Sequence, residues 1–271
     1  MRRTLAQFAQ ACGGRLTGAD AAYTDVVSDS RALQPRQLFI ALKGPHFNGH
    51  EFVAAALAAG AAGALVEAEQ PVRLPQIVVP DSQAALECAA RSWRAAFAGP
   101  LVGVAGSNGK TTAKEMTAAI LAQAGECLAT RGNLNNHIGV PLTLLRLTPA
   151  HRFAVVEMGA NHAGEVAALV AIARPTVGLI TNAGAEHLEG FGNLDGVAQG
   201  EGETVSCLAP EGTAIINADD AYAGYWRGIS GAKRIVTFGV HTHADFAAKN
   251  VFQGIERGEF ATRSGGGLPF F

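Results

Sequence analysis

The stretch Gly103-Val104-Ala105-Gly106-Ser107-Asn108-Gly109-Lys110-Thr111-Thr112 decides the fold, because it lies between a predicted strand at 102–105 and a predicted helix at 110–124. Glycines let a backbone approach phosphate oxygens closely, and successive N–H groups at a helix N-terminus form an anion-binding nest. Lys110 can reach the β- and γ-phosphates of a nucleotide, and the Thr111 hydroxyl can bind Mg²⁺. The stretch predicts a phosphate-binding loop, although Val104 stands where a Walker A motif has its first glycine.

Short apolar segments alternate with helical ones on both sides of this loop, which is typical of α/β architecture. The strands are expected at 38–42, 64–67, 77–79, 153–158, 177–181, 213–217 and 234–238, and further helices at 5–12, 51–59, 82–97 and 164–172. Ala98-Gly99-Pro100 marks a boundary. We expect a small N-terminal α/β domain at 1–98, and a P-loop-type domain at 99–271 with a mostly parallel sheet flanked by helices.

The composition excludes several classes of protein. Hydrophobic residues make up 48% of the 271 residues, which rules out a disordered chain, and the net charge of −2 does not call for a nucleic acid or an anionic membrane as partner. The longest uncharged apolar run, 52–66, contains two glycines and is too short to span a membrane. Four widely separated cysteines indicate reduced thiols, so we expect a cytoplasmic protein.

Four segments carry a resemblance to a known family. Gly106–Thr112 resembles the ATP loop of the Mur ligases and folylpolyglutamate synthases, enzymes that join a carboxylate to an amine. Gly132–Arg146 resembles the GNLNN-x-IG-x-P segment of the MurF type of Mur ligase, which the MurE type lacks. Glu157–Glu165 and Glu186–Gly192 resemble the E-[LM]-G-A-N-x-x-G-E and A-H-L-E-G-F-G motifs of the same type. The MurF type joins D-alanyl-D-alanine to UDP-N-acetylmuramoyl-tripeptide in peptidoglycan precursor synthesis.

The N-terminal residues resemble the same family. Ser28-Asp29-Ser30-Arg31, Leu38–Gly44 and Asn48-Gly49-His50 are similar to the UDP-binding domain of the MurE and MurF ligases. Ser-Asp-Ser-Arg alone is better explained as a solvated turn, but its place ahead of the ATP loop favours the binding role. The resemblance implies that Ser30, Arg31, Lys43 and Asn48 contact the UDP-muropeptide.

The resemblance also implies a mechanism, in which ATP phosphorylates the tripeptide carboxylate and the amine of D-alanyl-D-alanine attacks the acyl phosphate. Lys110 would stabilise the transferring phosphoryl group, Thr111 and Glu157 would hold one Mg²⁺, and His187 would bind a second. Glu157 lies at the carboxyl end of an apolar strand, where ligands collect in open α/β sheets, and the alternative is an exposed strand-end carboxylate. Without the resemblance, His187 reads as an ordinary loop histidine. The implied ATP-binding residues are Gly106, Ser107, Asn108, Gly109, Lys110, Thr111 and Thr112. The implied muropeptide-binding residues are Asn133, Asn135, Asn136, Asn161 and His162, the last two of which could equally cap the following helix.

Two departures from the family pattern stand out. Glu201 occupies the position of a lysine that is commonly carbamylated to give the second metal a carboxylate. Our hypothesis is that Glu201 supplies this carboxylate directly, through a bridging water; the alternative is a solvated helix residue. The family also continues into a third domain beyond the point where this sequence stops, at Phe271. We therefore expect the first two domains of a monomeric three-domain enzyme, able to bind its substrates but to ligate poorly.

Two other functions are alternatives to a MurF-type ligase. One is a non-catalytic remnant that binds nucleotide or UDP-muropeptide, favoured by Glu201 and by the early end of the sequence. The other is a ligase of the MurE or folylpolyglutamate type, which the Asn133–Asn136 run argues against.

Overall fold

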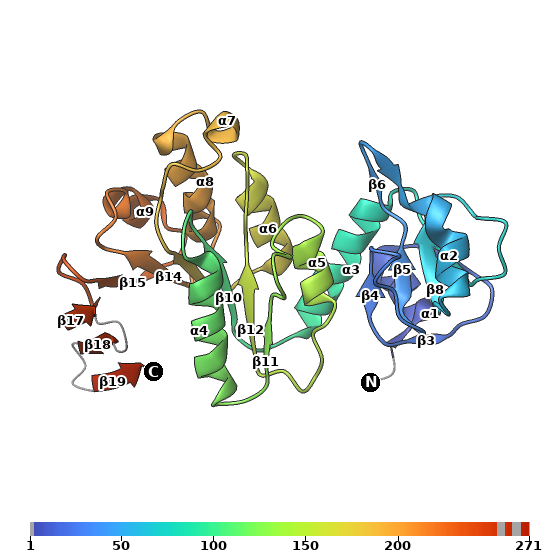
Figure 1. Cartoon of the computed structure of the whole chain (residues 1–271), viewed down its shortest axis with the longest axis horizontal. Coiled ribbons are helices and arrows are strands. Elements are labelled where there is room, and N and C mark those ends of the chain that lie inside the picture. Colours follow the sequence, from blue (N-terminus) through green and yellow to red (C-terminus); the bar gives the residue numbers. More distant parts are fainter. Residues whose placement is uncertain (1–2, 254–257, 262–266, 271) are drawn as a thin grey trace. The chain divides into compact units, whose positions relative to one another are not determined.

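The computed structural model describes residues 3–253, 258–261 and 267–270, and the chain falls into two compact units (Figure 1). Unit 1 consists of Met1–Gly99 and Thr130–Arg152, and unit 2 of Pro100–Ala129 and Phe153–Phe271. Thr130–Arg152, which the sequence placed in the second domain, lies with unit 1 because α5 (Gly139–Leu144) packs against α3 (Ser82–Ala96). Arg3 stabilises this arrangement by donating hydrogen bonds to the carbonyl oxygens of Leu145 and Leu147, at 2.6 and 2.5 Å.

Unit 1 is built on a five-stranded sheet in the order β2-β9-β8-β5-β4, in which only the pair of β2 and β9 is antiparallel. The strands are β2 (Arg15–Thr17), β4 (Val26–Val27), β5 (Leu38–Ile40), β8 (Gly63–Val66) and β9 (Gln76–Val78). Two small pairs add β1 (Arg3–Thr4) to β3 (Ala22–Tyr23), and β6 (Lys43–Gly44) to β7 (Phe47–Asn48). The remaining helices are α1 (Leu5–Cys12), η1 (Gly49–Phe52) and α2 (Val53–Ala58).

Local sequence explains where the first helix of unit 1 begins and ends. Thr4 and Gln7 form a capping box, in which each side chain accepts the backbone N–H of the other residue. Gly13 ends the helix in a left-handed conformation, with φ of 70°. The buried face of α1, with Leu5, Phe8 and Ala9, packs toward α3. The expected helix at 5–12 is thus confirmed at both ends.

Unit 2 contains a seven-stranded, wholly parallel sheet in the order β11-β12-β10-β13-β14-β15-β16. Its strands are β10 (Leu101–Ala105), β11 (Cys127–Ala129), β12 (Phe153–Glu157), β13 (Val177–Ile180), β14 (Thr213–Asn217), β15 (Arg234–Gly239) and β16 (Phe246–Ala247). Its helices are α4 (Lys110–Ala122), α6 (Glu165–Ala173), α7 (Leu188–Phe191), α8 (Leu194–Ser206) and α9 (Ala223–Ile229). A separate antiparallel sheet contains β17 (Lys249–Gln253), β18 (Gly258–Ala261) and β19 (Gly267–Phe270).

Alternation along the strands puts helices on both faces of the large sheet. On one face, Val102, Val104 and Val155 pack against Ala113 and other residues of α4. On the other face, Ile180 packs with residues of α8 and with the fully buried Trp226 of α9. The predicted α/β class, with a mostly parallel sheet flanked by helices, is confirmed.

The strand order fixes where a ligand can bind in unit 2. β10 is buried along its whole length and pairs with β12 on one side and β13 on the other. The chain therefore leaves β10 toward one edge of the sheet and later returns to its other side. In open parallel sheets such a reversal opens a crevice at the carboxyl ends of the strands, where ligands bind. Here the segment after β10 is Gly106–Gly109, the predicted phosphate loop.

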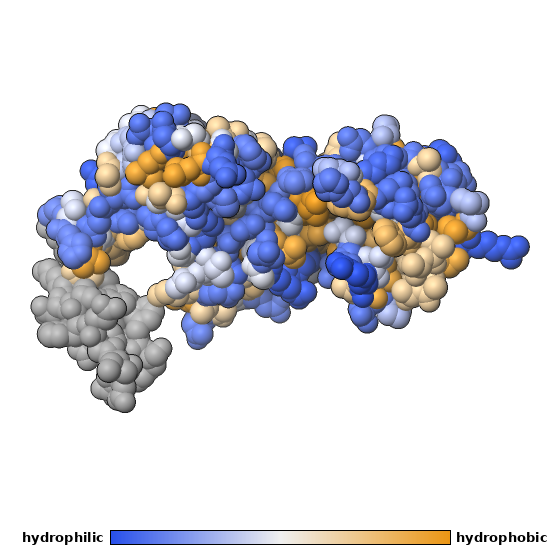
Figure 2. Space-filling view, turned by 45° about the horizontal axis from the view of Figure 1, so that its top comes forward, coloured by the Kyte–Doolittle hydropathy of each residue, from blue (hydrophilic) through white to orange (hydrophobic). Residues whose placement is uncertain are grey.

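The surface carries scattered apolar residues. Figure 2 shows hydrophilic residues over much of the visible face, with smaller hydrophobic areas between them. The exposed large apolar side chains include Phe47, Leu134, Ile120 and Tyr225, and single exposures of this kind are ordinary. In the described part of the chain no helix is both long enough and apolar enough to cross a membrane.

Asp219 joins the ends of two neighbouring strands of unit 2. Its carboxylate accepts the backbone N–H groups of Val240 at 2.5 Å, Thr242 at 2.6 Å and His241 at 3.1 Å, which follow β15. Partial burial raises the pKa of Asp219, but these N–H donors outweigh it and hold the pKa below its ordinary value. The charged carboxylate therefore stabilises the native turn.

We predict that Asp219→Ala lowers the free energy of unfolding at pH 7 by about 1–2 kcal/mol, because three N–H groups lose their acceptor. Since the folded pKa is depressed, this contribution is present above the unfolded pKa near 4 and is lost as the pH falls through the folded pKa. Urea unfolding followed by tryptophan fluorescence measures both effects. Equal midpoints for the two proteins at pH 7 would contradict the prediction.

Candidate functional site: a phosphate loop at the carboxyl end of β10

Two glycines in left-handed conformations shape the loop between β10 and α4. Gly109, with φ of 80°, is the N-cap of α4 and provides no capping side chain to the 13-residue helix. An uncapped helix N-terminus leaves backbone N–H groups and the positive end of the dipole for an anion. Gly106, with φ of 122°, lies so close to the end of β13 that an added Cβ would be 2.1 Å from Thr181 Oγ1. Both positions therefore require glycine.

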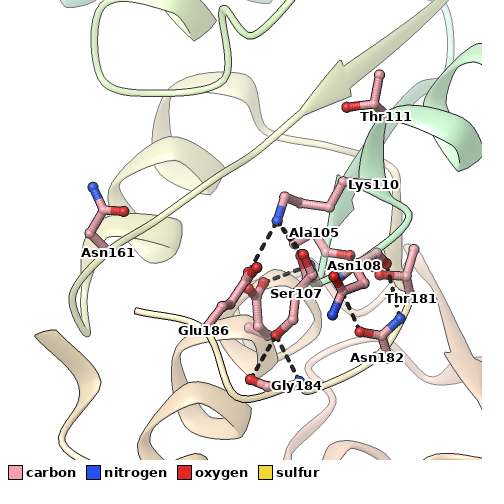
Figure 3. A network of polar contacts seen from close by, with 12 residues as sticks. Ala105, Ser107, Asn108, Lys110, Thr111, Asn161, Thr181, Asn182, Gly184 and Glu186 are labelled. Carbon is pink, nitrogen blue, oxygen red and sulfur yellow. Dashed lines mark hydrogen bonds and ion pairs between the residues drawn. The ribbon is translucent and has the colours of Figure 1, made fainter. Parts of the chain in front are cut away.

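The loop is held by the segment that follows β13 (Figure 3). Ser107 N donates to the Asn182 carbonyl at 2.9 Å, and Asn108 N donates to Asn182 Oδ1 at 3.0 Å. Asn182 Nδ2 returns a bond to the Asn108 carbonyl at 2.9 Å. Ser107 Oγ accepts the N–H of Gly184 at 2.8 Å. Asn182 and Gly184 were not among the predicted site residues, because the sequence does not show that the strand they follow lies beside β10.

Lys110 is folded back over the loop. Its Nζ donates to the carbonyl oxygens of Gly106 at 2.6 Å and Ser107 at 2.9 Å, and forms an ion pair with Glu186 Oε1 at 3.3 Å. The side chain is 16% exposed and that of Glu186 is 26% exposed. The ammonium group therefore already lies at the loop, where it can exchange the Glu186 carboxylate for a phosphate oxygen.

Thr111 and Glu157 meet at the start of α4. Thr111 Oγ1 donates to Glu157 Oε2 at 2.9 Å, and Glu157, the last residue of β12, is only 2% exposed. The reading of Glu157 as an exposed strand-end carboxylate is therefore wrong. A hydroxyl and a carboxylate oxygen are ligands that Mg²⁺ prefers, so this pair fits one Mg²⁺. Within residues 3–253, 258–261 and 267–270, no three His, Cys, Asp or Glu side chains form a metal-binding cluster.

Glu201 contacts the phosphate loop from α8. Glu201, in α8, is 2% exposed, and its Oε2 accepts the N–H of Gly106 at 2.6 Å. Burial raises the pKa of Glu201 to about 7, although the nearby Lys110 charge opposes this shift. The alternative of a solvated helix residue is therefore wrong.

His187 is the N-cap residue of α7. It is exposed and adopts a left-handed conformation with φ of 51°.

Asn161 and His162 precede α6 but do not cap it. Their backbone N–H groups donate to Glu165 Oε2, at 2.7 and 3.3 Å, and both residues are exposed. The helix is instead capped by Glu203 of α8, whose carboxylate accepts the N–H groups of Gly164 at 2.7 Å and Ala167 at 2.8 Å. The side chains of Asn161 and His162 therefore do not have the capping role that the sequence left open. Figure 3 shows Asn161 apart from the phosphate-loop network.

Unit 1 brings together some of its predicted UDP-muropeptide residues. Lys43 forms an ion pair with Glu67, whose backbone N–H donates to His50 Nε2 at 2.8 Å. Asn48 Oδ1 accepts the His50 backbone N–H at 3.2 Å and lies 2.8 Å from His50 Nδ1. The hairpin of β6 and β7 is thus joined to the end of β8 through His50, a residue that the predicted site left out.

The other predicted residues of unit 1 lie in turns. Arg31 forms an exposed ion pair with Asp29 at 2.8 Å, which holds the pKa of Asp29 at about 2. Ser30, between them, is half-buried.

The predicted asparagines of unit 1 precede α5. Asn136 Oδ1 accepts the N–H groups of Ile138 at 3.1 Å and Gly139 at 2.9 Å. The Asn133 carbonyl accepts the N–H of Asn135 at 2.8 Å. Asn136 therefore shapes the start of α5.

Unit 2 has a phosphate loop at the switch point of a parallel sheet. Lys110 of this loop is paired with Glu186, and Thr111 is hydrogen-bonded to Glu157. These features define a nucleotide-binding α/β protein. Residues 104–268 match the model of the Mur ligase middle domain, and residues 22–94 match that of the Mur ligase family, catalytic domain. The chain belongs to the Mur ligase family.

Comparisons with individual proteins agree with this assignment. The chain is 45% identical to UDP-N-acetylmuramoyl-tripeptide--D-alanyl-D-alanine ligase of Escherichia coli K12, over 92% of this chain and 55% of the relative. It is 41% identical to the ligase of the same name in Haemophilus influenzae, over 90% of this chain and 54% of the relative. A crystal structure of MurF from Acinetobacter baumannii matches with a TM-score of 0.90 and 34% identity, over 100% of this chain and 61% of that one. The chain spans about half the length of the curated relatives it matches.

We predict that Asn182→Ala weakens the binding of ATP and ADP about tenfold, since losing the bonds that shape the loop costs on the order of 1.4 kcal/mol. Binding of adenosine, which has no phosphate, should not change. Asn182→Asp keeps the acceptor for Asn108 N–H but loses the donor and adds a negative charge beside the loop, so it should weaken ATP and ADP binding at least as much. Isothermal titration measures all three ligands, and an equal loss for adenosine would contradict a role in phosphate binding.

Proposed function

We propose that this chain carries the nucleotide-binding and UDP-muropeptide-binding parts of an ATP-dependent, ADP-forming ligase. The reaction joins D-alanyl-D-alanine to UDP-N-acetylmuramoyl-tripeptide through an acyl phosphate, in cytoplasmic synthesis of peptidoglycan precursors. The observation that carries the proposal is that α4 begins with Lys110, whose Nζ is folded back over the loop, and with Thr111, whose hydroxyl is bonded to Glu157. The names of the Escherichia coli and Haemophilus influenzae relatives support the choice of substrates.

ATP fits the loop because each of its phosphates finds a donor there. Lys110 Nζ, released from Glu186, would neutralise charge on the transferring phosphoryl group. The N–H groups at the start of α4 would bind the neighbouring phosphate oxygens. A crystal structure of MurF ligase from Thermotoga maritima in complex with ADP, with a TM-score of 0.74 and 28% identity, supports nucleotide binding. Gly106–Thr112 as a whole would form the ATP site.

Magnesium would be held by Thr111 Oγ1 and Glu157 Oε2, which lie 2.9 Å apart. The chemistry supplied by Mg²⁺ at this pair would be neutralisation of negative charge on the nucleotide phosphates. The chain's own contribution is to keep Glu157 buried and aimed at Thr111, so that the two oxygens are already in place. His187, which is exposed at the start of α7, would bind a second Mg²⁺.

Residues predicted to contact the muropeptide are found in unit 1 and, separately, in unit 2. In unit 1, Ser30, Arg31, Lys43 and Asn48 would contact the UDP moiety, and Asn133, Asn135 and Asn136 the peptide. In unit 2, the exposed side chains of Asn161 and His162 would contribute further polar contacts. The protein would act as a monomer on these two substrates, UDP-N-acetylmuramoyl-tripeptide and D-alanyl-D-alanine.

The substrate is tested by titrating the chain with two muropeptides that differ in peptide length. UDP-N-acetylmuramoyl-tripeptide should bind at least tenfold more tightly than UDP-N-acetylmuramoyl-L-alanyl-D-glutamate. Tighter binding of the shorter peptide would support a ligase of the MurE type. Tighter binding of a folate, titrated in the same way, would support the folylpolyglutamate type. Phosphate release that requires ATP, the tripeptide and D-alanyl-D-alanine together supports a ligase. Tight tripeptide binding without any release supports the non-catalytic alternative.

We predict that Lys110→Met lowers the affinity for MgATP at least 30-fold, because the phosphates lose a charge-assisted bond of about 2 kcal/mol. Lys233→Met, which removes an exposed lysine before β15, is the matched control and should bind like the parent chain. Binding of a fluorescent ATP analogue measures the loss. If Lys110→Met and Lys233→Met bind equally well, the nucleotide does not use the loop lysine.

A further inference from the structure

We propose that Glu201 is a positioning residue of the phosphate loop, which it holds through the backbone N–H of Gly106, and that it is not a ligand of a metal ion. This replaces the metal role that the family pattern suggests for the position. It deepens the proposed function, because nucleotide binding is one of its readouts.

The contact is direct and buried. Glu201 lies in α8, a helix that packs against β10 and β13. Its Oε2 is 2.6 Å from Gly106 N, and the residue is 2% exposed. Gly106 is the first residue after β10, and the close approach of Thr181 leaves its backbone little freedom. A short hydrogen bond at this point therefore sets the direction in which the loop leaves the sheet.

Glu201 completes a set of acceptors that hold the first half of the loop. The N–H of Gly106 goes to Glu201, and those of Ser107 and Asn108 go to the Asn182 carbonyl and Oδ1. These three N–H groups are engaged by the protein itself. A nucleotide must therefore use the N–H groups that follow, from Gly109 into the first turn of α4. Glu201 thus acts on the phosphates through the loop and does not touch them.

The same geometry argues against a metal at Glu201. A cation that displaced Oε2 from the Gly106 N–H would leave a buried N–H without an acceptor, which is unfavourable. The oxygens that suit Mg²⁺, those of Thr111 and Glu157, are provided by α4 and β12, whereas Glu201 comes from α8. The charged groups that face Glu201 are Lys110, Glu186 and Glu203. The lysine already provides a positive charge for the carboxylate.

Two substitutions separate the two roles. Glu201→Gln keeps an oxygen that accepts the Gly106 N–H, but removes the charge that a metal ligand needs. We expect it to bind ATP within about threefold of the parent and with the same dependence on Mg²⁺ concentration. Glu201→Ala removes the acceptor, and we expect its affinity for ATP and ADP to fall about tenfold at every Mg²⁺ concentration. Glu211→Ala, in the exposed turn before β14, is the matched control.

The opposite pattern overturns the proposal. If Glu201→Gln and Glu201→Ala both need more Mg²⁺, and excess Mg²⁺ restores ATP binding to both, Glu201 is a metal ligand. If Glu201→Ala binds ATP like Glu211→Ala, the contact has no influence on the site.

Hydrogen exchange at the Gly106 amide tests the contact without any ligand. Exchange should be fast in Glu201→Ala and slow in both the parent and Glu201→Gln, because only the last two retain an acceptor. This result stands even if the parent chain binds no ATP, which would count against the proposed function alone. Equal exchange at Gly106 in the parent chain and Glu201→Ala would overturn the positioning role.

Discussion

The phosphate loop depends on one constraint, which is that the backbone N–H groups of its first half are bound by acceptors of the protein itself. Asn182, after β13, provides two of them, and Glu201 of α8 provides a third. These acceptors are in place because β10 lies between β12 and β13 in a wholly parallel sheet. The loop is therefore shaped by its neighbours, and the glycine at 106 allows them to approach.

The ligand-binding half of the loop follows from the same constraint. With its first N–H groups engaged, the loop leaves the uncapped start of α4 to an anion. Lys110 is held at the loop by two carbonyl oxygens and Glu186, and Thr111 is held by Glu157. Each of these side chains is thus positioned by protein contacts that a phosphate or Mg²⁺ can replace. Such preorganisation lowers the cost of ordering the site when the nucleotide binds.

Much of this architecture could be predicted from the sequence. The strand, glycine loop and helix at 102–124 have a local signature, and so do the apolar strands that make the parallel sheet. The sequence also indicated Glu157 through its place at the end of a strand, and the structure puts it beside Thr111. Glu157 lies within reach of Thr111 because strand ends in a parallel sheet meet at one edge.

The rest depends on contacts between residues far apart in the chain. Glu201 and Gly106 are separated by 95 positions, so no local pattern shows that a helix carboxylate accepts a loop N–H. Asn182 was missed for the same reason. The segment Thr130–Arg152 follows a strand of unit 2 in sequence but packs with unit 1, because α5 finds its apolar partner in α3.

The central claim is that phosphates bind to the second half of the loop while the protein itself holds the first half. The most direct measurement is amide hydrogen exchange along residues 106–112, with and without MgADP. The account predicts that MgADP slows exchange at Gly109, Lys110 and Thr111, and leaves Gly106, Ser107 and Asn108 as slow as they were. Protection by MgADP confined to Gly106–Asn108, or no change anywhere in the loop, would contradict it.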